Sequence, residues 1–127
     1  MNNKRLGTEF EREVCDILNR AGWWVHFMSP DARGAQPFDI IAVKHRCAVA
    51  IDCKTSASKI FKIDRLEDNQ IMAFDKWITC GNVPPVVFVK HAGKIRLVPY
   101  GVLKMLKKID LSKTDEYSDD TLWGWYV

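Results

Sequence analysis

The sequence lacks the marks of membrane, secreted and zinc-binding proteins. No apolar run approaches the roughly 20 residues that a membrane-spanning helix needs. The polar start, residues 1–5, has no apolar stretch behind it to serve as a signal peptide, so we expect a cytoplasmic protein. The four cysteines form no CxxC pair and lie inside apolar segments. Their placement argues against a zinc knuckle or a disulfide framework and favours reduced, buried thiols.

Repeats, low-complexity tracts and linkers rich in proline or glycine are also missing, so nothing divides the chain. Its 127 residues fit one compact domain, and 47% hydrophobic with 28% charged residues is typical of a globular protein. The net charge of +3 tolerates a polyanionic partner without predicting one. We therefore predict a single domain over residues 1–127.

The first half of the chain predicts one helix followed by three strands. Apolar residues recur at three- and four-residue steps over 6–21, which is typical of an amphipathic helix. The aromatic and β-branched run 23–28 predicts a strand, and a polar loop follows over 29–37. Two more strands, 38–43 and 48–52, are joined by a short basic turn and predict an antiparallel hairpin.

The second half predicts another helix, a second hairpin and a short third helix. Asp64 is the expected N-cap of the second helix, whose apolar positions lie within 66–78. Strands are expected at 85–89 and 95–98, and a short helix at 102–106. The order of elements indicates an α/β fold in which helices pack on a mixed sheet.

The tail, residues 110–127, is acidic and then aromatic. Its aromatic side chains can dock on the protein's own core or on a partner. The sequence leaves both possibilities open, and in the second case the tail is an interface element.

A group of charged residues lies on the first predicted hairpin. Asp52 and Lys54 are two apart on one strand, so their side chains emerge on the same face. Asp39 begins the preceding strand, and folding the hairpin brings its carboxylate next to that of Asp52. Two such carboxylates repel unless a cation lies between them, and their hard oxygen atoms suit Mg²⁺ or Mn²⁺. A divalent cation and a nearby lysine together favour phosphodiester hydrolysis.

These residues resemble the motif of a known nuclease superfamily. Pro37-Phe38-Asp39, followed after twelve residues by Asp52-Cys53-Lys54, is similar to the PD-(D/E)xK motif of the restriction-endonuclease-like nucleases. The upstream segment 7–13 resembles the first-helix signature of archaeal-type Holliday junction resolvases. The resemblance covers roughly residues 5–80.

The resemblance implies a restriction-endonuclease-like core, a central mixed sheet flanked by helices in the order α-β-β-β-α-β-β-α. It implies that Glu11, four residues after Gly7, joins Asp39, Asp52 and the backbone carbonyl of Cys53 as metal ligands. It also implies that Gln70 of the second helix faces the site. One departure is Asp52 itself, where resolvases of this group more often carry glutamate.

By this resemblance the chain is a structure-selective endodeoxyribonuclease that uses Mg²⁺, with Mn²⁺ as a substitute. A four-way DNA junction is the favoured substrate, and a symmetric homodimer is expected because a junction needs two matched nicks. Two alternatives stay open. One is a restriction, repair or phage DNA-processing nuclease of the same superfamily, and the other is a catalytically silent DNA-binding module.

Each candidate residue also has an ordinary structural interpretation. Asp52 and Lys54 can form a surface ion pair, and Asp39 can cap a turn. Glu11 lies among acids that favour the positive end of a helix, although it borders the apolar face. Gln70 can be a plain polar residue of its helix.

Other features are less specific. The three histidines are scattered over the sequence and are expected to be non-catalytic, and the tryptophans are expected in the core or an interface. Basic residues flank the proposed site and suit phosphate contacts, as well as an ordinary solvated face; these are Lys44, Arg46, Lys54, Lys59, Lys62 and Arg65. Ser29, Arg33 and Gln36 lie in a loop where a substrate strand can pass.

Overall fold

The computed structural model of the chain describes residues 3–28 and 36–126. The helices are α1 (Asn3–Arg20), α2 (Asp68–Thr79), α3 (Tyr100–Leu106) and α4 (Asp119–Gly124), with short 3-10 turns η1 (Ile63–Arg65) and η2 (Leu111–Lys113). The strands are β1 (Trp24–Phe27), β2 (Ile40–Lys44), β3 (Cys47–Thr55), β4 (Ile60–Lys62), β5 (Val86–His91), β6 (Lys94–Pro99), β7 (Lys108–Asp110) and β8 (Asp115–Glu116).

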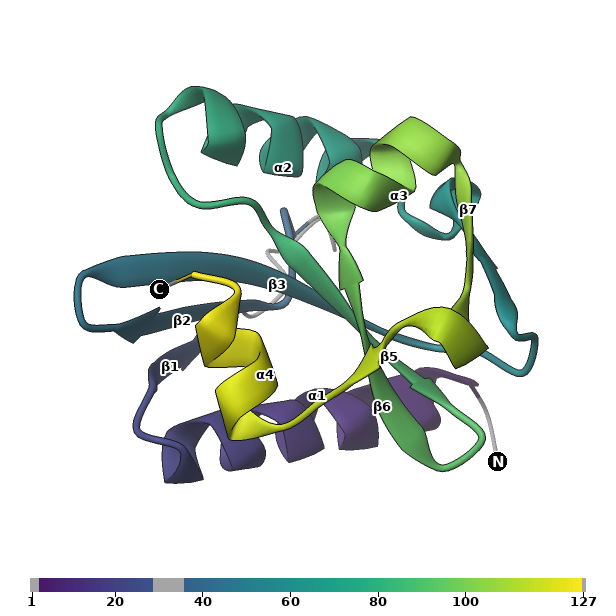
Figure 1. Cartoon of the computed structure of the whole chain (residues 1–127), viewed down its shortest axis with the longest axis horizontal. Helices are drawn as coiled ribbons and strands as arrows, with labels where there is room; N and C mark the ends of the chain where they lie inside the picture. Colours follow the sequence, from purple (N-terminus) through teal and green to yellow (C-terminus); the bar gives the residue numbers. More distant parts are fainter. Residues whose placement is uncertain (1–2, 29–35, 127) are drawn as a thin grey trace.

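One mixed sheet forms the centre of the molecule, in the strand order β1-β2-β3-β5-β6-β8. All neighbours in it are antiparallel except β3 and β5, which run parallel because α2 carries the chain back across the sheet. Helix α1 covers one face, and α2 and α3 cover the other (Figure 1). The predicted helices and strands occur in the predicted order among the elements that the structure has, and the central mixed sheet flanked by helices is confirmed.

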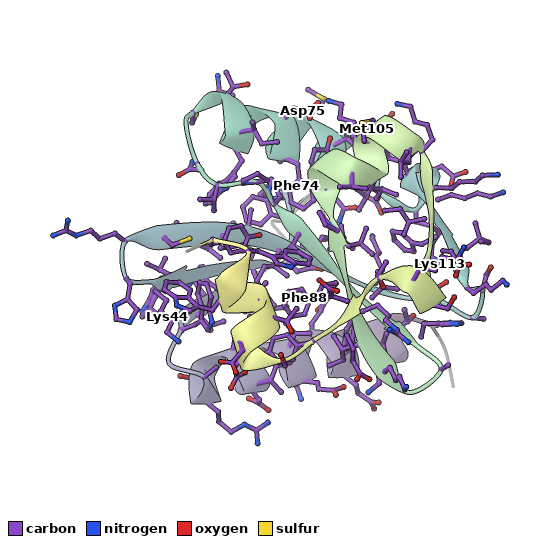
Figure 2. All side chains as sticks on the ribbon, in the orientation of Figure 1. Lys44, Phe74, Asp75, Phe88, Met105 and Lys113 are labelled. Carbon is purple, nitrogen blue, oxygen red and sulfur yellow. The ribbon has the colours of Figure 1, made fainter. Side chains whose placement is uncertain are left out.

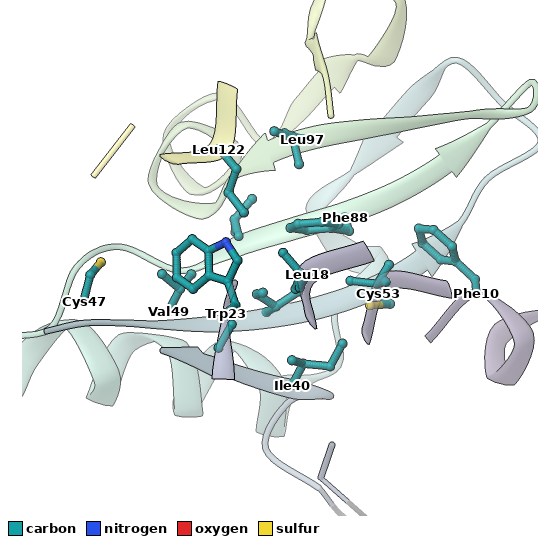
Figure 3. Close-up of a cluster of buried hydrophobic side chains, with 14 residues drawn as sticks. Phe10, Leu18, Trp23, Ile40, Cys47, Val49, Cys53, Phe88, Leu97 and Leu122 are labelled. Carbon is teal, nitrogen blue, oxygen red and sulfur yellow. The ribbon is translucent and has the colours of Figure 1, made fainter. Parts of the chain in front are cut away.

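Two apolar clusters fill the two sides of this sheet, and the alternation of side chains along β3 supplies both. On the α1 side, Ile51 and Cys53 pack with Phe10 and Phe88 (Figure 3). On the α2 side, Ala50 packs in the second cluster, which also contains Phe61, Phe74 and Tyr100. Figure 2 shows the two sides through Phe74, which lies by α2, and Phe88, which lies on the side of α1.

The start of the second helix differs from the sequence prediction. Asp64 is not its N-cap, because Ile63–Arg65 form a separate 3-10 turn and Leu66 after it has extended backbone, with ψ of 135°. Glu67 is the N-cap instead, and its N–H donates to the side chain of Gln70. Ahead of η1 the structure also has a strand that the sequence did not predict, β4, which pairs with β7 in a separate two-stranded sheet.

The aromatic tail docks on the protein's own core. Leu122 of α4 is 1% exposed and belongs to the cluster on the α1 side. The ring of Trp123 meets that of Trp23 edge to face, with 5.6 Å between centroids. Further along, the Tyr126 hydroxyl donates to the carbonyl of Pro84. A role of the tail in contacting a partner stays a prediction.

None of the helices within 3–28 and 36–126 has both the length and the apolar character needed to cross a membrane.

Candidate active site

Asp39 lies where β2 begins, and both its backbone and its side chain are held. Its N–H donates to the carbonyl of Ile51 on β3, and its carbonyl accepts from Met28, so sheet pairing continues past the end of β2. Its carboxylate accepts a hydrogen bond of 2.8 Å from the N–H of Cys53 and one of 2.5 Å from the side chain of Gln36. The side chain is 4% exposed. The hairpin therefore places this acid directly beside β3.

Asp52 and Lys54 form an ion pair that is largely removed from solvent. The Lys54 ammonium lies 3.4 Å from Oδ2 of Asp52, and the two side chains are 18% and 0% exposed. Oδ1 of Asp52 accepts a 2.9 Å hydrogen bond from Nε2 of Gln70, whereas Oδ2 has no hydrogen-bond partner among the residues that the structure describes. The burial argues against a simple surface pair, because an ionised carboxylate in the interior is costly unless it is compensated.

Gln70 reaches Asp52 because its amide is oriented by the start of α2. Its Oε1 accepts from the N–H of Glu67, so Nε2 is the end that faces the carboxylate. The neighbouring Asn69 donates from its side chain to the carbonyl of Gln36, which in turn holds Asp39. The first turn of α2 thus supports both acids.

Glu11 approaches from α1, on the opposite face of the sheet from α2. Burial first and the Asp39 carboxylate second raise the pKa of Glu11 to about 7, while Lys54 opposes the shift. The same two causes raise the pKa of Asp52 well above its usual range. The Asp39 carboxylate therefore raises the pKa of both groups. Glu11 lies on one side of the sheet margin and Asp52 on the other.

A family model for the archaeal Holliday junction resolvase (Hjc) matches residues 2–120. The chain belongs to this family. The solved structure of Hjc from Archaeoglobus fulgidus, a Holliday junction resolvase from an archaeal hyperthermophile, is similar with a TM-score of 0.72 and 21% sequence identity. The match covers 94% of this chain and 99% of that one, and it shows that the two share a fold. No curated protein matches the sequence.

The resemblance seen in the residues is thereby confirmed, and so is the expected fold class. The motif residues of this Hjc-family chain lie together at one end of β3, where β2 begins. Three of them, Asp39, Asp52 and Lys54, come from one hairpin, and Glu11 and Gln70 come from the helices on either face.

The donor chemistry of this Hjc-family site fits a hard divalent cation. The acids offer carboxylate oxygens, and one of them, Oδ2 of Asp52, is buried without a hydrogen-bond donor. Three carboxylates lie there beside the Lys54 ammonium, and a bound cation would offset their mutual repulsion. Within the described part of the chain, no three His, Cys, Asp or Glu side chains already have the geometry of a metal site.

Sequence reasoning missed the supporting amides. Gln36 was noted only as a residue on a possible substrate path, yet it binds Asp39, and Asn69 was not singled out. Neither carries a signal in the sequence, because asparagine and glutamine are common at helix starts and in loops. Ser29 and Arg33 lie outside the described residues.

The histidines make contacts of other kinds. His26 stacks on Trp24 with ring centroids 6.0 Å apart, and His45 lies 5.6 Å from the ring of Trp123. The ring of His91 bonds to the carbonyl of Ser56. The non-catalytic interpretation of the histidines stays a prediction.

Proposed function

We propose that this chain is a Mg²⁺-dependent endonuclease that cuts four-way DNA junctions as a homodimer, using Glu11, Asp39, Asp52, Lys54 and Gln70. Membership of the Hjc family makes it a structure-selective nuclease for Holliday junctions. The observation that carries the assignment of the site is the meeting of two buried acids and a lysine at the end of β3, with one carboxylate oxygen left without a donor.

Glu11, Asp39 and Asp52 are the side chains proposed to hold the ion. The carbonyl of Cys53 is the proposed fourth ligand, and the direction of its N–H supports this choice. That N–H donates to Asp39, and in a strand the N–H and C=O of one residue point to the same side. The Cys53 carbonyl is thereby directed toward the gap beside Asp39.

When bound, Mg²⁺ polarises the phosphoryl oxygens and lowers the pKa of water. Lys54 adds fixed positive charge where negative charge develops on the phosphate, and its ammonium can orient the attacking water. Gln70 acts as a positioning residue, because its amide keeps Oδ1 of Asp52 occupied and leaves Oδ2 for the ion.

The test is cleavage of a labelled four-way junction by the wild type and by Asp52→Asn, with Mg²⁺, with Mn²⁺ and with EDTA. We expect symmetric nicks with either metal, none in EDTA, and a rate at least about a hundredfold lower in the variant. Asp120→Asn, an exposed acid on α4, is the matched control and keeps full activity. Equal cutting by the wild type and Asp52→Asn would overturn the assigned site.

The two alternatives predict different results on a substrate panel. A processing nuclease of the same superfamily cuts plain duplex or single-stranded DNA as fast as the junction. A silent binding module binds junctions tightly and cuts none of the substrates with any divalent metal. Preferential cutting of the junction excludes both.

The homodimer follows from the need for two matched cuts on opposite strands. Light scattering should give a mass twice the 14.6 kDa of one chain at the concentration at which nicking is symmetric. The exposed Trp24 of β1, at 61%, and the aromatic tail are candidate contacts. A monomer at that concentration contradicts this part of the proposal.

A further inference from the structure

A cavity of about 380 Å³ lies just beyond the end of β3, next to the segment that carries Lys54. Its lining comes from the loop after β3, from β4 and from η1, and consists of Ser56, Ala57, Ser58, Ile60, Lys62, Asp64 and Arg65. The loop is tied by its own hydrogen bonds. The Ser56 hydroxyl donates to the carbonyl of Ser58, and the Ser58 hydroxyl accepts from the N–H of Ile60. The cavity therefore has fixed walls on the side of β3.

Arg65 is held at this cavity by two contacts. Its Nη2 donates a 2.7 Å hydrogen bond to the carbonyl of Thr55, the residue directly after Lys54. Its guanidinium carbon lies 5.5 Å from the centroid of the Phe61 ring, which is fully buried. A guanidinium carries five N–H donors in one plane, and the bond to Thr55 uses one of them. Its plane is thus oriented, while other donors remain for a ligand.

The charge around the cavity favours an anion. Lys54, Lys90 and Lys104 each pair with a carboxylate. By contrast, no carboxylate in the described part of the chain lies within 4.0 Å of the Arg65 guanidinium. Lys62 and Arg65 together with Asp64 leave one net positive charge on the cavity wall.

We propose that Arg65, with Lys62 beside it, binds the backbone phosphate next to the one that is cut. This inference rests on the proposed function, because it needs the scissile phosphate at Lys54. The guanidinium of Arg65 is anchored on the carbonyl of Thr55, the residue that follows Lys54 in β3. Its positive charge therefore lies just past the lysine that is proposed to face the scissile phosphate. Arginine suits this role because its planar donors bind phosphate in pairs.

The first experiment measures junction binding and cleavage by Arg65→Gln at several salt concentrations. We expect junction affinity to fall about five- to tenfold near physiological salt. The slope of log K against log salt should become shallower by about 0.9, the change expected for the loss of one phosphate contact. Arg65→Lys keeps the charge and should restore the slope with only part of the affinity.

The matched control is Arg20→Gln, which removes an exposed charge at the far end of α1. Arg20 follows Glu11 by nine residues, about 13 Å along a helix axis. Thermal unfolding of each variant shows whether the fold is intact. A loss of stability alone does not change the salt slope, so the slope separates phosphate binding from a structural role.

The second experiment identifies the phosphate. Single neutral methylphosphonates are placed in turn along the cut strand. At the position adjacent to the cleaved bond the substitution should weaken the wild type, and in Arg65→Gln this penalty should disappear. If every position costs both proteins the same, or if Arg20→Gln matches Arg65→Gln, the inference fails while the proposed function stands. A wild type that neither binds nor cuts junctions overturns both.

Discussion

Asp39 and Asp52 are both buried, yet their surroundings differ. Asp39 accepts hydrogen bonds from the N–H of Cys53 and from Gln36. Within residues 3–28 and 36–126, Oδ2 of Asp52 accepts no hydrogen bond and lies 3.4 Å from the ammonium of Lys54. Leaving a charged oxygen so weakly compensated in the interior costs stability. The chain therefore carries a strained acid where the proposed chemistry needs a ligand oxygen.

Substitution of Glu11 gives a pH-dependent test of the burial and the repulsion among these carboxylates. Its pKa is raised from 4.5 to about 7, so the folded state holds the proton more tightly than the unfolded state. The stability this provides is complete below pH 4.5 and is lost as the pH rises through about 7. In EDTA, Glu11→Gln should match the wild type in Tm at pH 4 and exceed it at pH 8. Because Glu11 is partly exposed, screening reduces the gain to about 1 kcal/mol, or roughly 4 °C.

The control for this prediction is Asp16→Asn, an exposed carboxylate on the same helix. Its difference from the wild type should stay small and should not change between these pH values. Parallel Tm curves for Glu11→Gln and the wild type from pH 4 to pH 8 would show that Glu11 is not strained.

The catalytic candidates on the hairpin are predictable from the sequence because local geometry fixes them. Strand alternation puts Asp52 and Lys54 on one face, and the short turn returns Asp39 to their side. Gln36 and Asn69 are not predictable in this way. Their bond depends on where the loop before β2 meets α2, which is a tertiary contact between residues 33 apart.

At the scale of elements, the first turn of α2 contributes both to the stability of the fold and to the arrangement of the site. Gln70 accepts from the N–H of Glu67 and donates to Asp52, so one side chain caps the helix and orients an acid. Gln70→Met keeps the volume and removes both bonds. We expect the free energy of unfolding, measured by chemical denaturation, to fall by about 2 kcal/mol, at about 1 kcal/mol for each hydrogen bond. Junction cleavage should also be slower. Asn69→Ala, which removes only the bond to Gln36, should cost about half as much in stability. Equal costs for the two variants would count against this dual role.

Lys44 connects three elements at the other end of the sheet. Its ammonium donates to the carbonyl of Ala21 after α1, and it lies 5.9 and 5.3 Å from the ring centroids of Trp23 and Trp123. Lys44→Met retains the apolar stem but loses the hydrogen bond and the cation–π attraction. We expect a destabilisation of about 1–2 kcal/mol by urea unfolding.

The comparison for Lys44 is Lys94→Met, at an exposed position of the β5–β6 hairpin. The free energy of unfolding of this variant should stay within about 0.5 kcal/mol of the wild-type value. Similar losses for the two variants would mean that Lys44 does not hold the tail to α1.

The sequence predicts the elements that are long enough to show a periodic pattern of apolar residues. Helix α1 and the strands of the two hairpins have it, whereas β4, β7 and β8 have two or three residues each. Asp115 and Glu116 of β8 have low strand propensity and are extended because they pair with Arg96 and Leu97 at the sheet edge. Such short strands depend on tertiary pairing, so local patterns do not reveal them.

At the scale of the whole molecule, the site lies where both helical layers meet the sheet. Glu11 comes with α1 on one face, and Gln70 comes with α2 on the other, while the hairpin acids lie at the margin between them. An ion held there as proposed would tie the two layers together through Glu11 and Asp52. Because such an ion binds only the folded chain, its affinity adds to the stability of the whole domain.

Mg²⁺ should therefore raise the Tm of the wild type, even in the absence of DNA. At ten times its dissociation constant the ion adds about 1.4 kcal/mol, which is roughly 5 °C for a domain of this size. Asp52→Asn and Asp39→Asn should each remove the shift, since each loses a proposed ligand. Asp120→Asn should keep it, and sodium chloride at matched ionic strength should not reproduce it. A Tm that rises equally in Asp52→Asn and the wild type would mean that Mg²⁺ binds elsewhere, because only a site made by these acids loses the ion with them.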